Sequence, residues 1–274
     1  MLKQRLIFGA LGVILAILII TFCPVYIIGI CVGIIAAIGL GEFYNVTGLI
    51  KKKSAVVVPG FIASIVFCAI SVVNTDAFYD YMVLITVAYV FVLMLMMVFF
   101  RSNCSFSDVA LSFAGTIYVT VFFLHIFFVR KMNLGNLLIW VLFISAWSTD
   151  TFAYFAGRCL GKHKLCPSIS PKKTVEGAFG GVVGCLICVC AYVAIVAKYN
   201  SLSVNYFNTV ILALVASVFS QVGDLAASCI KRENNVKDYG NLIPGHGGIL
   251  DRFDSVLLIS PVVYYIMTYL PVFK

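Results

Sequence analysis

Charged residues are scarce in this sequence: only 11% of its 274 residues are Asp, Glu, Lys or Arg, and 62% are hydrophobic. A typical soluble domain has about 25% charged and about 45–50% apolar residues. The mean hydropathy is +1.09, and so few charges cannot cover a surface that faces water. The composition therefore excludes an ordinary soluble protein and predicts an integral membrane protein.

Cysteines do not point to a disulfide framework. The chain has 10 Cys, and most of them lie inside apolar runs, as Cys185, Cys188 and Cys190 do. In such runs a thiol behaves as a small apolar side chain. Cys159, His163 and Cys166 are close in sequence, but no fourth ligand follows at a spacing typical of zinc sites.

Long apolar runs are abundant. A transmembrane helix needs about 20 mostly apolar residues, and we expect about nine of them in an all-α, polytopic membrane helix bundle. The predicted spans are residues 6–22, 25–40, 55–73, 81–100, 109–129, 136–156, 177–197, 209–230 and 255–270. The first run follows Lys3 and Arg5 as a signal peptide would, but it lacks a small-residue cleavage site, so we expect an uncut helix.

Basic residues are unevenly placed around these runs. With a cytoplasmic N-terminus, all but four of the 19 Lys and Arg residues fall in cytoplasmic segments. The exceptions are Arg130, Lys131, Lys198 and Lys274. The positive-inside rule therefore predicts that the N-terminus is cytoplasmic and the C-terminus is outside. This asymmetry accounts for the net charge of +8, and we expect no nucleic-acid partner.

The first five predicted spans are nearly free of acidic residues, whereas the last four hold most of the polar groups. We therefore divide the chain into an N-terminal scaffold half, residues 1–135, and a C-terminal catalytic half, residues 136–274. The segments after the sixth and eighth spans carry more basic residues than orientation requires. They are the first place to look for a binding site.

Four aspartates interrupt or border the late spans: Asp150, Asp224, Asp251 and Asp254. An Asp near the centre of a membrane helix costs about 2.5–3.5 kcal/mol on insertion scales, so such residues are candidates for function. In the predicted topology all four lie at the cytoplasmic level. The alternative is a structural role, in which the carboxylate bonds to neighbouring amides or to a loop Arg.

Polar residues recur at helical spacing on three late spans, so each of these spans has one polar face. The three faces are Gln221, Asp224, Ser228 and Lys231; Asp150, Tyr154 and Gly157; and Asp251 with Asp254. A polar stripe on an apolar helix faces the bundle interior or a water-filled cavity. Carboxylates with few His or Cys nearby favour Mg²⁺ over zinc or copper.

The segment 170–177, between the sixth and seventh spans, reads SPKKTVEG. Lys172, Lys173 and Thr174 precede a helix whose first N–H groups suit a phosphate. The alternative is a plain helix cap, with Ser170 or Thr174 as N-cap and Glu176 in the first turn. A cap alone does not explain two adjacent lysines. Four glycines then predict close helix packing: Gly177, Gly180, Gly181 and Gly184.

The segment 237–254 is rich in glycine and ends in paired aspartates. Glycines allow backbone amides to approach a ligand closely. Lys237, Arg252 and His246 beside these aspartates suit a nucleotide triphosphate and its metal. His246 could transfer a proton, bind a phosphate or brace the loop, and these alternatives stay open.

These motifs resemble a known family. The 27 residues from Ser228 to Asp254 resemble, without a break, the signature of the phosphatidate cytidylyltransferases. The stretches 150–157, 170–177 and 223–224 are similar to other motifs of that family. The resemblance implies transfer of CMP from CTP to phosphatidic acid, giving CDP-diacylglycerol and pyrophosphate. It also implies Mg²⁺, raises K⁺ as a second cation, and implies a homodimer in a bacterial plasma membrane. The placement of the active site on the cytoplasmic side follows from the charge asymmetry and the level of the four aspartates.

The resemblance also assigns roles to residues. It implies that Asp224 and Asp251 bind the metal, with Asp254 near. The expected catalytic residues are Asp224, Asp251, Lys231, Arg232 and His246. The expected substrate-binding residues are Asp150, Tyr154, Lys172, Lys173, Thr174, Ser228, Lys237, Asp238, Gly247, Gly248 and Arg252.

Three other functions are alternatives to the transfer of CMP to phosphatidic acid, and the sequence fits them to different degrees. The same chemistry on another lipid phosphate fits the residues equally well, because nothing in the sequence identifies acyl chains. A proton-coupled transporter would also have acids inside its helices, but usually at the membrane midplane. A CDP-alcohol phosphotransferase would need a DGxxAR-type motif, which the sequence lacks.

Overall fold

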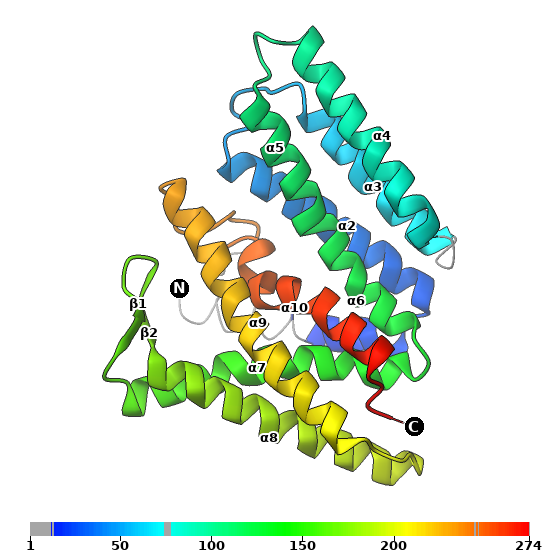
Figure 1. Cartoon of the computed structure of the whole chain (residues 1–274), viewed down its shortest axis with the longest axis vertical. Helices are drawn as coiled ribbons and strands as arrows, with labels where there is room; N and C mark the ends of the chain where they lie inside the picture. The colour runs from blue at the N-terminus through cyan, green and yellow to red at the C-terminus, as the bar shows by residue number, and fades with distance from the viewer. Residues whose placement is uncertain (1–11, 13, 74–77, 244, 246, 274) are drawn as a thin grey trace. The chain divides into compact units, whose positions relative to one another are not determined.

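The computed structural model describes residues 12, 14–73, 78–243, 245 and 247–273. Long helices dominate these residues, with one small hairpin (Figure 1). In chain order the helices are α2 (Val25–Val46), α3 (Val57–Val73), α4 (Phe78–Phe99), α5 (Phe106–Gly115), the π-helical turn Thr116–Val121, α6 (Phe122–Lys131), α7 (Gly135–Leu160), α8 (Val175–Asn200), α9 (Tyr206–Glu233) and α10 (Leu250–Tyr269). Residues 14–22 are also helical.

Among the described residues, six helices are long and apolar enough to cross a membrane. They are Val25–Val46, Asp80–Phe99, Phe106–Lys131, Gly135–Leu160, Val175–Asn200 and Tyr206–Glu233. Helices suit a bilayer because they satisfy every backbone polar group internally. The chain is therefore a polytopic, predominantly helical membrane protein, as predicted.

The predicted spans can be compared with these helices one by one. Every span from the second to the ninth falls on a helix. However, α3 has only 17 residues, and α10 is not among the six apolar helices. Residues 6–11 and 13 of the first predicted span lie outside the described residues, and residues 14–22 of it are helical. A total of nine crossings and a cytoplasmic N-terminus therefore stay predictions.

The segment between α7 and α8 departs from the all-α prediction. Strand β1 (Lys164–Cys166) pairs antiparallel with β2 (Ser170–Thr174), with Lys164 opposite Thr174 and Cys166 opposite Ser170. Helix α7 ends where Gly161 takes up extended backbone, and Pro167 disfavours helical backbone at Cys166, the last residue of β1. The two strands satisfy each other's backbone groups, and β2 leads directly into α8.

The chain divides into two compact units, which we describe separately. Unit 1 comprises Met1–Phe127 and Asn234–Arg252, and unit 2 comprises Phe128–Glu233 and Phe253–Lys274. The segment 234–252 thus groups with the N-terminal helices, although it belongs to the predicted catalytic half. The division into a scaffold half and a catalytic half stays a prediction.

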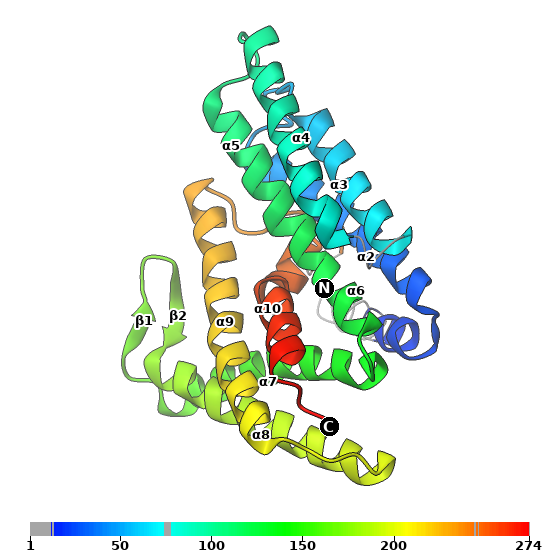
Figure 2. The ribbon, with the colours of Figure 1, turned by 45° about the vertical axis from the view of Figure 1, so that its right-hand side comes forward.

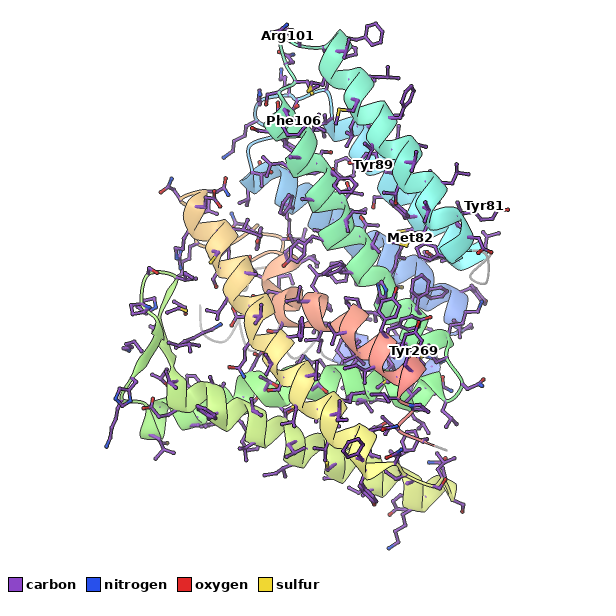
Figure 3. The ribbon with its side chains drawn as sticks, viewed as in Figure 1. Tyr81, Met82, Tyr89, Arg101, Phe106 and Tyr269 are labelled. Atoms are coloured by element: carbon purple, nitrogen blue, oxygen red, sulfur yellow. The ribbon has the colours of Figure 1, made fainter. Side chains whose placement is uncertain are left out.

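Buried hydroxyls tie the helices of unit 1 together. The hydroxyls of Tyr44 on α2 and Tyr89 on α4 each lie 2.9 Å from Ser112 Oγ and 2.9 Å from Thr116 Oγ1. In Figure 3 Tyr89 lies between α4 and α5, whereas Tyr81 points outward near the other end of α4. Such hydroxyl contacts specify which apolar helices pack together in a membrane protein.

Glycines bring α7 and α8 into close contact in unit 2. The two helices lie side by side in Figures 1 and 2. A methyl group added at Gly180 would lie 2.2 Å from Ala156 Cβ, and one at Gly184 would lie 2.1 Å from the Phe152 ring. The predicted close packing of this glycine-rich face is confirmed.

Side-chain hydrogen bonds fix α9 against both of these helices. Thr149 Oγ1 on α7 donates to Ser217 Oγ on α9 at 3.0 Å. One turn later, Gln221 Nε2 donates to the carbonyl oxygen of Ala178 on α8 at 3.2 Å. These contacts set the rotation of α9, so that the face carrying Asp224 is turned toward α7 and α8.

Candidate active site

A cavity of about 530 Å³ lies in unit 2, where α7, the β1–β2 hairpin, the start of α8 and α9 meet. We call it the lysine cavity. Its charged and polar wall is formed by Asp150, Tyr154, Arg158, Lys172, Lys173, Thr174, Gln221 and Asp224. Residues from three predicted motifs, far apart in the sequence, therefore line one cavity.

An ion pair crosses this cavity wall. Lys173 Nζ on β2 lies 2.7 Å from Asp224 Oδ2 on α9. Their side chains are 27% and 31% exposed, so the pair remains accessible from the cavity. A lysine held in this way can bind an anion, because an ammonium has three donors and the carboxylate uses only part of them.

Two further aspartates lie close to Asp224. The Ser255 hydroxyl of α10 donates to Asp150 Oδ2 at 3.1 Å, which links α10 to α7. Asp254 accepts the backbone N–H of Ser255 at 2.8 Å. Asp150, Asp224 and Asp254 are near enough for their negative charges to repel one another, whereas the positive charge of Lys231 attracts Asp254.

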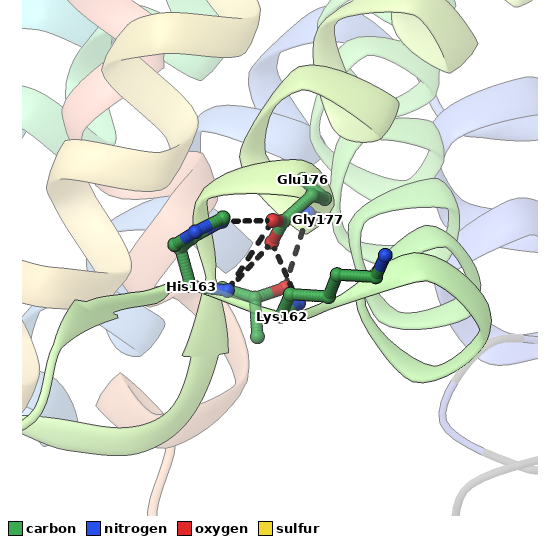
Figure 4. A network of polar contacts seen from close by, with 5 residues as sticks. Lys162, His163, Glu176 and Gly177 are labelled. Carbon is green, nitrogen blue, oxygen red and sulfur yellow. Dashed lines mark hydrogen bonds and ion pairs between the residues drawn. The ribbon is translucent and has the colours of Figure 1, made fainter.

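The base of the hairpin is closed onto the first turn of α8 (Figure 4). Glu176 Oε1 lies 2.7 Å from His163 Nδ1, and Glu176 Oε2 accepts the Lys162 backbone N–H at 3.1 Å. Thr174 is the N-cap of α8 and accepts the Gly177 N–H at 3.1 Å. Of the two predicted N-cap candidates, Thr174 is therefore correct. These hydrogen bonds fix the hairpin to the first turn of α8, so that Lys172 and Lys173 stay beside the lysine cavity.

A second cavity, of about 480 Å³, lies in unit 1 along the glycine-rich segment. We call it the loop cavity. Its lining is Lys237, Asp238, Asn241, Ile243, Gly245, Gly247 and Arg252. The predicted grouping of a lysine, an arginine and loop glycines is thus present within this unit.

Asp251 accepts hydrogen bonds from the backbone of the glycine-rich segment 237–254. Its buried carboxylate oxygen Oδ2 accepts the N–H groups of Tyr239 at 2.7 Å and Gly248 at 3.0 Å. Gly247 has a φ of +84°, which favours glycine, and a methyl group there would lie 2.7 Å from the same oxygen. The backbone therefore wraps closely around this carboxylate.

Comparison with known proteins identifies the family. A family model described as "Cytidylyltransferase family" matches residues 3–270 of the chain. The chain belongs to the cytidylyltransferase family. It is similar to a protein named phosphatidate cytidylyltransferase from Bacillus subtilis (strain 168), with 35% identity over 97% of each chain.

Two staphylococcal relatives of this cytidylyltransferase carry the same name. The protein from Staphylococcus epidermidis (strain ATCC 35984) is 34% identical over 84% of this chain and 85% of its own. The protein from Staphylococcus aureus (strain COL) is 35% identical over 89% of this chain and 93% of its own. The likeness therefore extends well beyond the C-terminal motifs and covers most of the chain.

Some predicted site residues of this cytidylyltransferase line neither the lysine cavity nor the loop cavity. Ser228 and Arg232 lie on α9 but do not line either of the cavities described. Lys231 is buried, with 8% exposure. His246 lies outside the described residues, so its role stays open.

Sequence reasoning missed Glu42. This residue lies on α2, and its carboxylate accepts the backbone N–H groups of Ile249 and Leu250. The predicted second span ends at residue 40, whereas α2 runs to Val46, so Glu42 falls just outside the predicted helix. An acid inside an apolar helix is the signal that could have found it.

The carboxylates of unit 2 fit a hard divalent cation in donor type. Among the described residues, however, no three His, Cys, Asp or Glu side chains gather as a metal site. A cation on Asp224 would compete with the ammonium of Lys173. Asp251 lies in unit 1, and metal binding by Asp224, Asp251 and Asp254 stays a prediction.

Proposed function

We propose that this chain is a phosphatidate cytidylyltransferase, which transfers CMP from CTP to phosphatidic acid. The observation that carries the proposal is the lysine cavity, where Lys172 and Lys173 of the hairpin lie beside Asp150 on α7 and Asp224 on α9. A cavity of this kind suits a phosphate attached to a lipid, because the charged groups receive the headgroup while apolar helices border the bilayer. The relatives' names agree with this activity.

The reaction is an in-line substitution at phosphorus. A phosphate oxygen of phosphatidic acid attacks the α-phosphorus of CTP and forms a new P–O–P bond. The bond between the α-phosphorus and the bridging oxygen breaks, and pyrophosphate leaves with that oxygen. A phosphomonoester has a second pKa of about 6, so the nucleophile is already largely ionised at neutral pH. The protein therefore needs no strong general base, and His246 need not transfer a proton.

The protein's main task is to bring two anions together and align them. Lys172 and Lys173 on the hairpin, and Lys237 and Arg252 beside the loop cavity, are the groups we propose for binding phosphate. Lys231 and Arg232 at the end of α9 are further candidates. Each provides a fixed positive charge that acts on negative charge during the transfer.

We propose Mg²⁺ as the cofactor, held by Asp224 and Asp251 with Asp254 near, and K⁺ as a second cation. A bound Mg²⁺ would neutralise phosphate charge and polarise the bond that breaks. We also propose a homodimer in a bacterial plasma membrane, with the site on the cytoplasmic side. The basic residues of the hairpin and of the segment after α9 support this orientation.

The position of a radiolabel can test the reaction. Protein purified in detergent is incubated with phosphatidic acid, Mg²⁺ and CTP labelled at either the α- or the γ-phosphorus. We expect the α-label in a chloroform-soluble CDP-lipid and the γ-label in pyrophosphate, in equal amounts. Transfer of the γ-label to lipid would indicate a kinase and would contradict the proposal.

The acceptor needs its own control. The same assay is run with an ether-linked phosphatidate and a polyprenyl phosphate, which carry the same kind of phosphomonoester. A clear preference for phosphatidic acid supports the proposed acceptor. If only polyprenyl phosphate gave product, transfer of CMP from CTP would be supported, but phosphatidic acid would be rejected as the acceptor. Failure with every lipid phosphate, while a related enzyme works in the same detergent, would reject the activity.

A further inference from the structure

Glu42 joins two parts of unit 1 that are far apart in the sequence. Its Oε1 accepts the N–H of Ile249 at 2.8 Å, and its Oε2 accepts the N–H of Leu250 at 2.9 Å. These are amides at the start of α10, which no earlier turn of that helix can satisfy. A carboxylate is favourable there because it also meets the positive end of the helix dipole.

The glycine-rich loop closes around the same carboxylate. A methyl group added at Gly248 would lie 2.4 Å from Glu42 Oε1, and one added at Gly240 would lie 2.8 Å from it. Both ends of the loop therefore approach Glu42 more closely than a residue with a side chain would allow. Leu250 is also buried, and its side chain meets Gly39, one turn before Glu42 on α2.

Asp251 holds the loop through a different set of amides. It accepts from Tyr239 and Gly248, whereas Glu42 accepts from Ile249 and Leu250. The backbone at Tyr239 and at residues 248–250 is thus held by two carboxylates, although each carboxylate repels the other electrostatically. Residues of the same loop line the loop cavity. The position of this lining therefore depends on both carboxylates.

We propose that Glu42 is a positioning residue, which sets the start of α10 and thereby the place of Asp251 and the loop lining. It acts through backbone amides, because each of its carboxylate oxygens already accepts one N–H. The kinetic consequence of this proposal rests on the proposed function. The contact itself can be tested without that function.

Asp108 offers a matched control for a purely structural acid. It also lies in unit 1, forms a capping box with Ser105 at the start of α5, and pairs with Lys52 at 2.5 Å. Like Glu42, it caps a helix, but that helix carries no predicted site residue. Replacing Asp108 with Asn should therefore lower stability without changing the kinetics of the folded enzyme.

The test compares Glu42→Gln and Glu42→Ala with Asp108→Asn. Gln keeps one acceptor oxygen, so amide hydrogen exchange at Ile249 and Leu250 should rise on the order of 10-fold, and further in the Ala variant. Turnover per folded enzyme should fall in the Gln variant and fall further in the Ala variant. The Mg²⁺ concentration for half-maximal rate should rise in both. Asp108→Asn should leave both kinetic quantities near the wild-type values.

Two results would overturn the proposal. One is wild-type exchange at Ile249 and Leu250 in Glu42→Gln. The other is normal turnover and Mg²⁺ dependence combined with a lower unfolding temperature, which would make Glu42 a structural cap only. If both variants fail to fold, Glu42→Asp, which keeps the charge, is measured in the same two ways.

Failure of the proposed function gives a different result. In that case the wild-type protein itself would make no CDP-lipid from CTP and phosphatidic acid. Hydrogen exchange at Ile249 and Leu250 would then decide alone whether Glu42 positions the start of α10.

Discussion

Lys173 Nζ lies 2.7 Å from Asp224 Oδ2, so a lysine expected to bind phosphate is paired with an aspartate expected to bind metal. The pair connects the β1–β2 hairpin to α9 within unit 2. A partly exposed ion pair of this kind contributes only about 0–1 kcal/mol to stability. We therefore expect the pair to matter for function more than for stability, because it would keep both charges beside the lysine cavity in the proposed reaction.

Replacing Lys173 with Met should reduce turnover strongly with little loss of stability. Removal of one group that stabilises transition-state charge typically costs about 10²–10³-fold in rate. Steady-state rates with CTP and phosphatidic acid measure the effect, and thermal unfolding checks the fold. Lys164→Met is the matched control, because Lys164 is an exposed lysine on the same hairpin that does not line the lysine cavity. Equal rates in the two variants would contradict the assignment.

Asp224→Asn and Asp251→Asn should each abolish turnover while the protein stays folded. Asn is nearly the same size as Asp, but its neutral amide oxygen is a weaker ligand for a hard cation than a carboxylate is. Turnover is measured over a range of Mg²⁺ concentrations, and size-exclusion chromatography monitors folding. Chelation of Mg²⁺ should also stop the wild-type reaction, and added Mg²⁺ should restore it. Near-normal activity in either variant would reject the metal assignment.

Ser255→Ala should lower activity more than Ser260→Ala does. Ser255 donates to Asp150 at 3.1 Å, between two helices, whereas Ser260 donates to the Leu257 carbonyl oxygen in its own helix. Loss of the first bond should cost about 1 kcal/mol and leave Asp150 less well oriented. Activity and unfolding temperature are measured for both variants. The same loss in both would show that the Asp150 contact has no special role.

Gly184→Ala should destabilise unit 2. The added methyl group would lie 2.1 Å from the Phe152 ring, so α7 and α8 would have to separate. Overpacking of this kind typically costs about 1–3 kcal/mol. Gly33→Ala on α2 is the control, because its methyl group would make an ordinary 3.4 Å contact with Cys68. Thermal unfolding in detergent compares the two variants, and equal stability would show that α8 can shift without penalty.

A cysteine at Ser168 should react from the cytoplasmic side. Ser168 is exposed in the turn between β1 and β2. In a chain with Cys159 and Cys166 replaced by Ser, Ser168→Cys should react with an impermeant maleimide in inside-out vesicles and remain unlabelled in right-side-out ones. The opposite pattern would reverse the predicted orientation of the membrane helices.

Local patterns in the sequence determined the membrane class and the position of the helices. Hydropathy and polar periodicity depend on neighbouring residues, so they predicted a helix at each span from the second to the ninth and a polar face on α9. The family was also accessible, because its signature is a continuous stretch from Ser228 to Asp254. The Gly180 and Gly184 spacing likewise predicted the close contact of α8 with a neighbour.

Only the tertiary structure decided which groups face each other. Lys173 with Asp224, Ser255 with Asp150, and Glu42 with the start of α10 join residues from different elements. Such pairs depend on how each helix is rotated and which helix lies beside it, and no short stretch of sequence contains that information. The scarcity of charge predicted a membrane protein, whereas the folded chain determines which of its few charges meet.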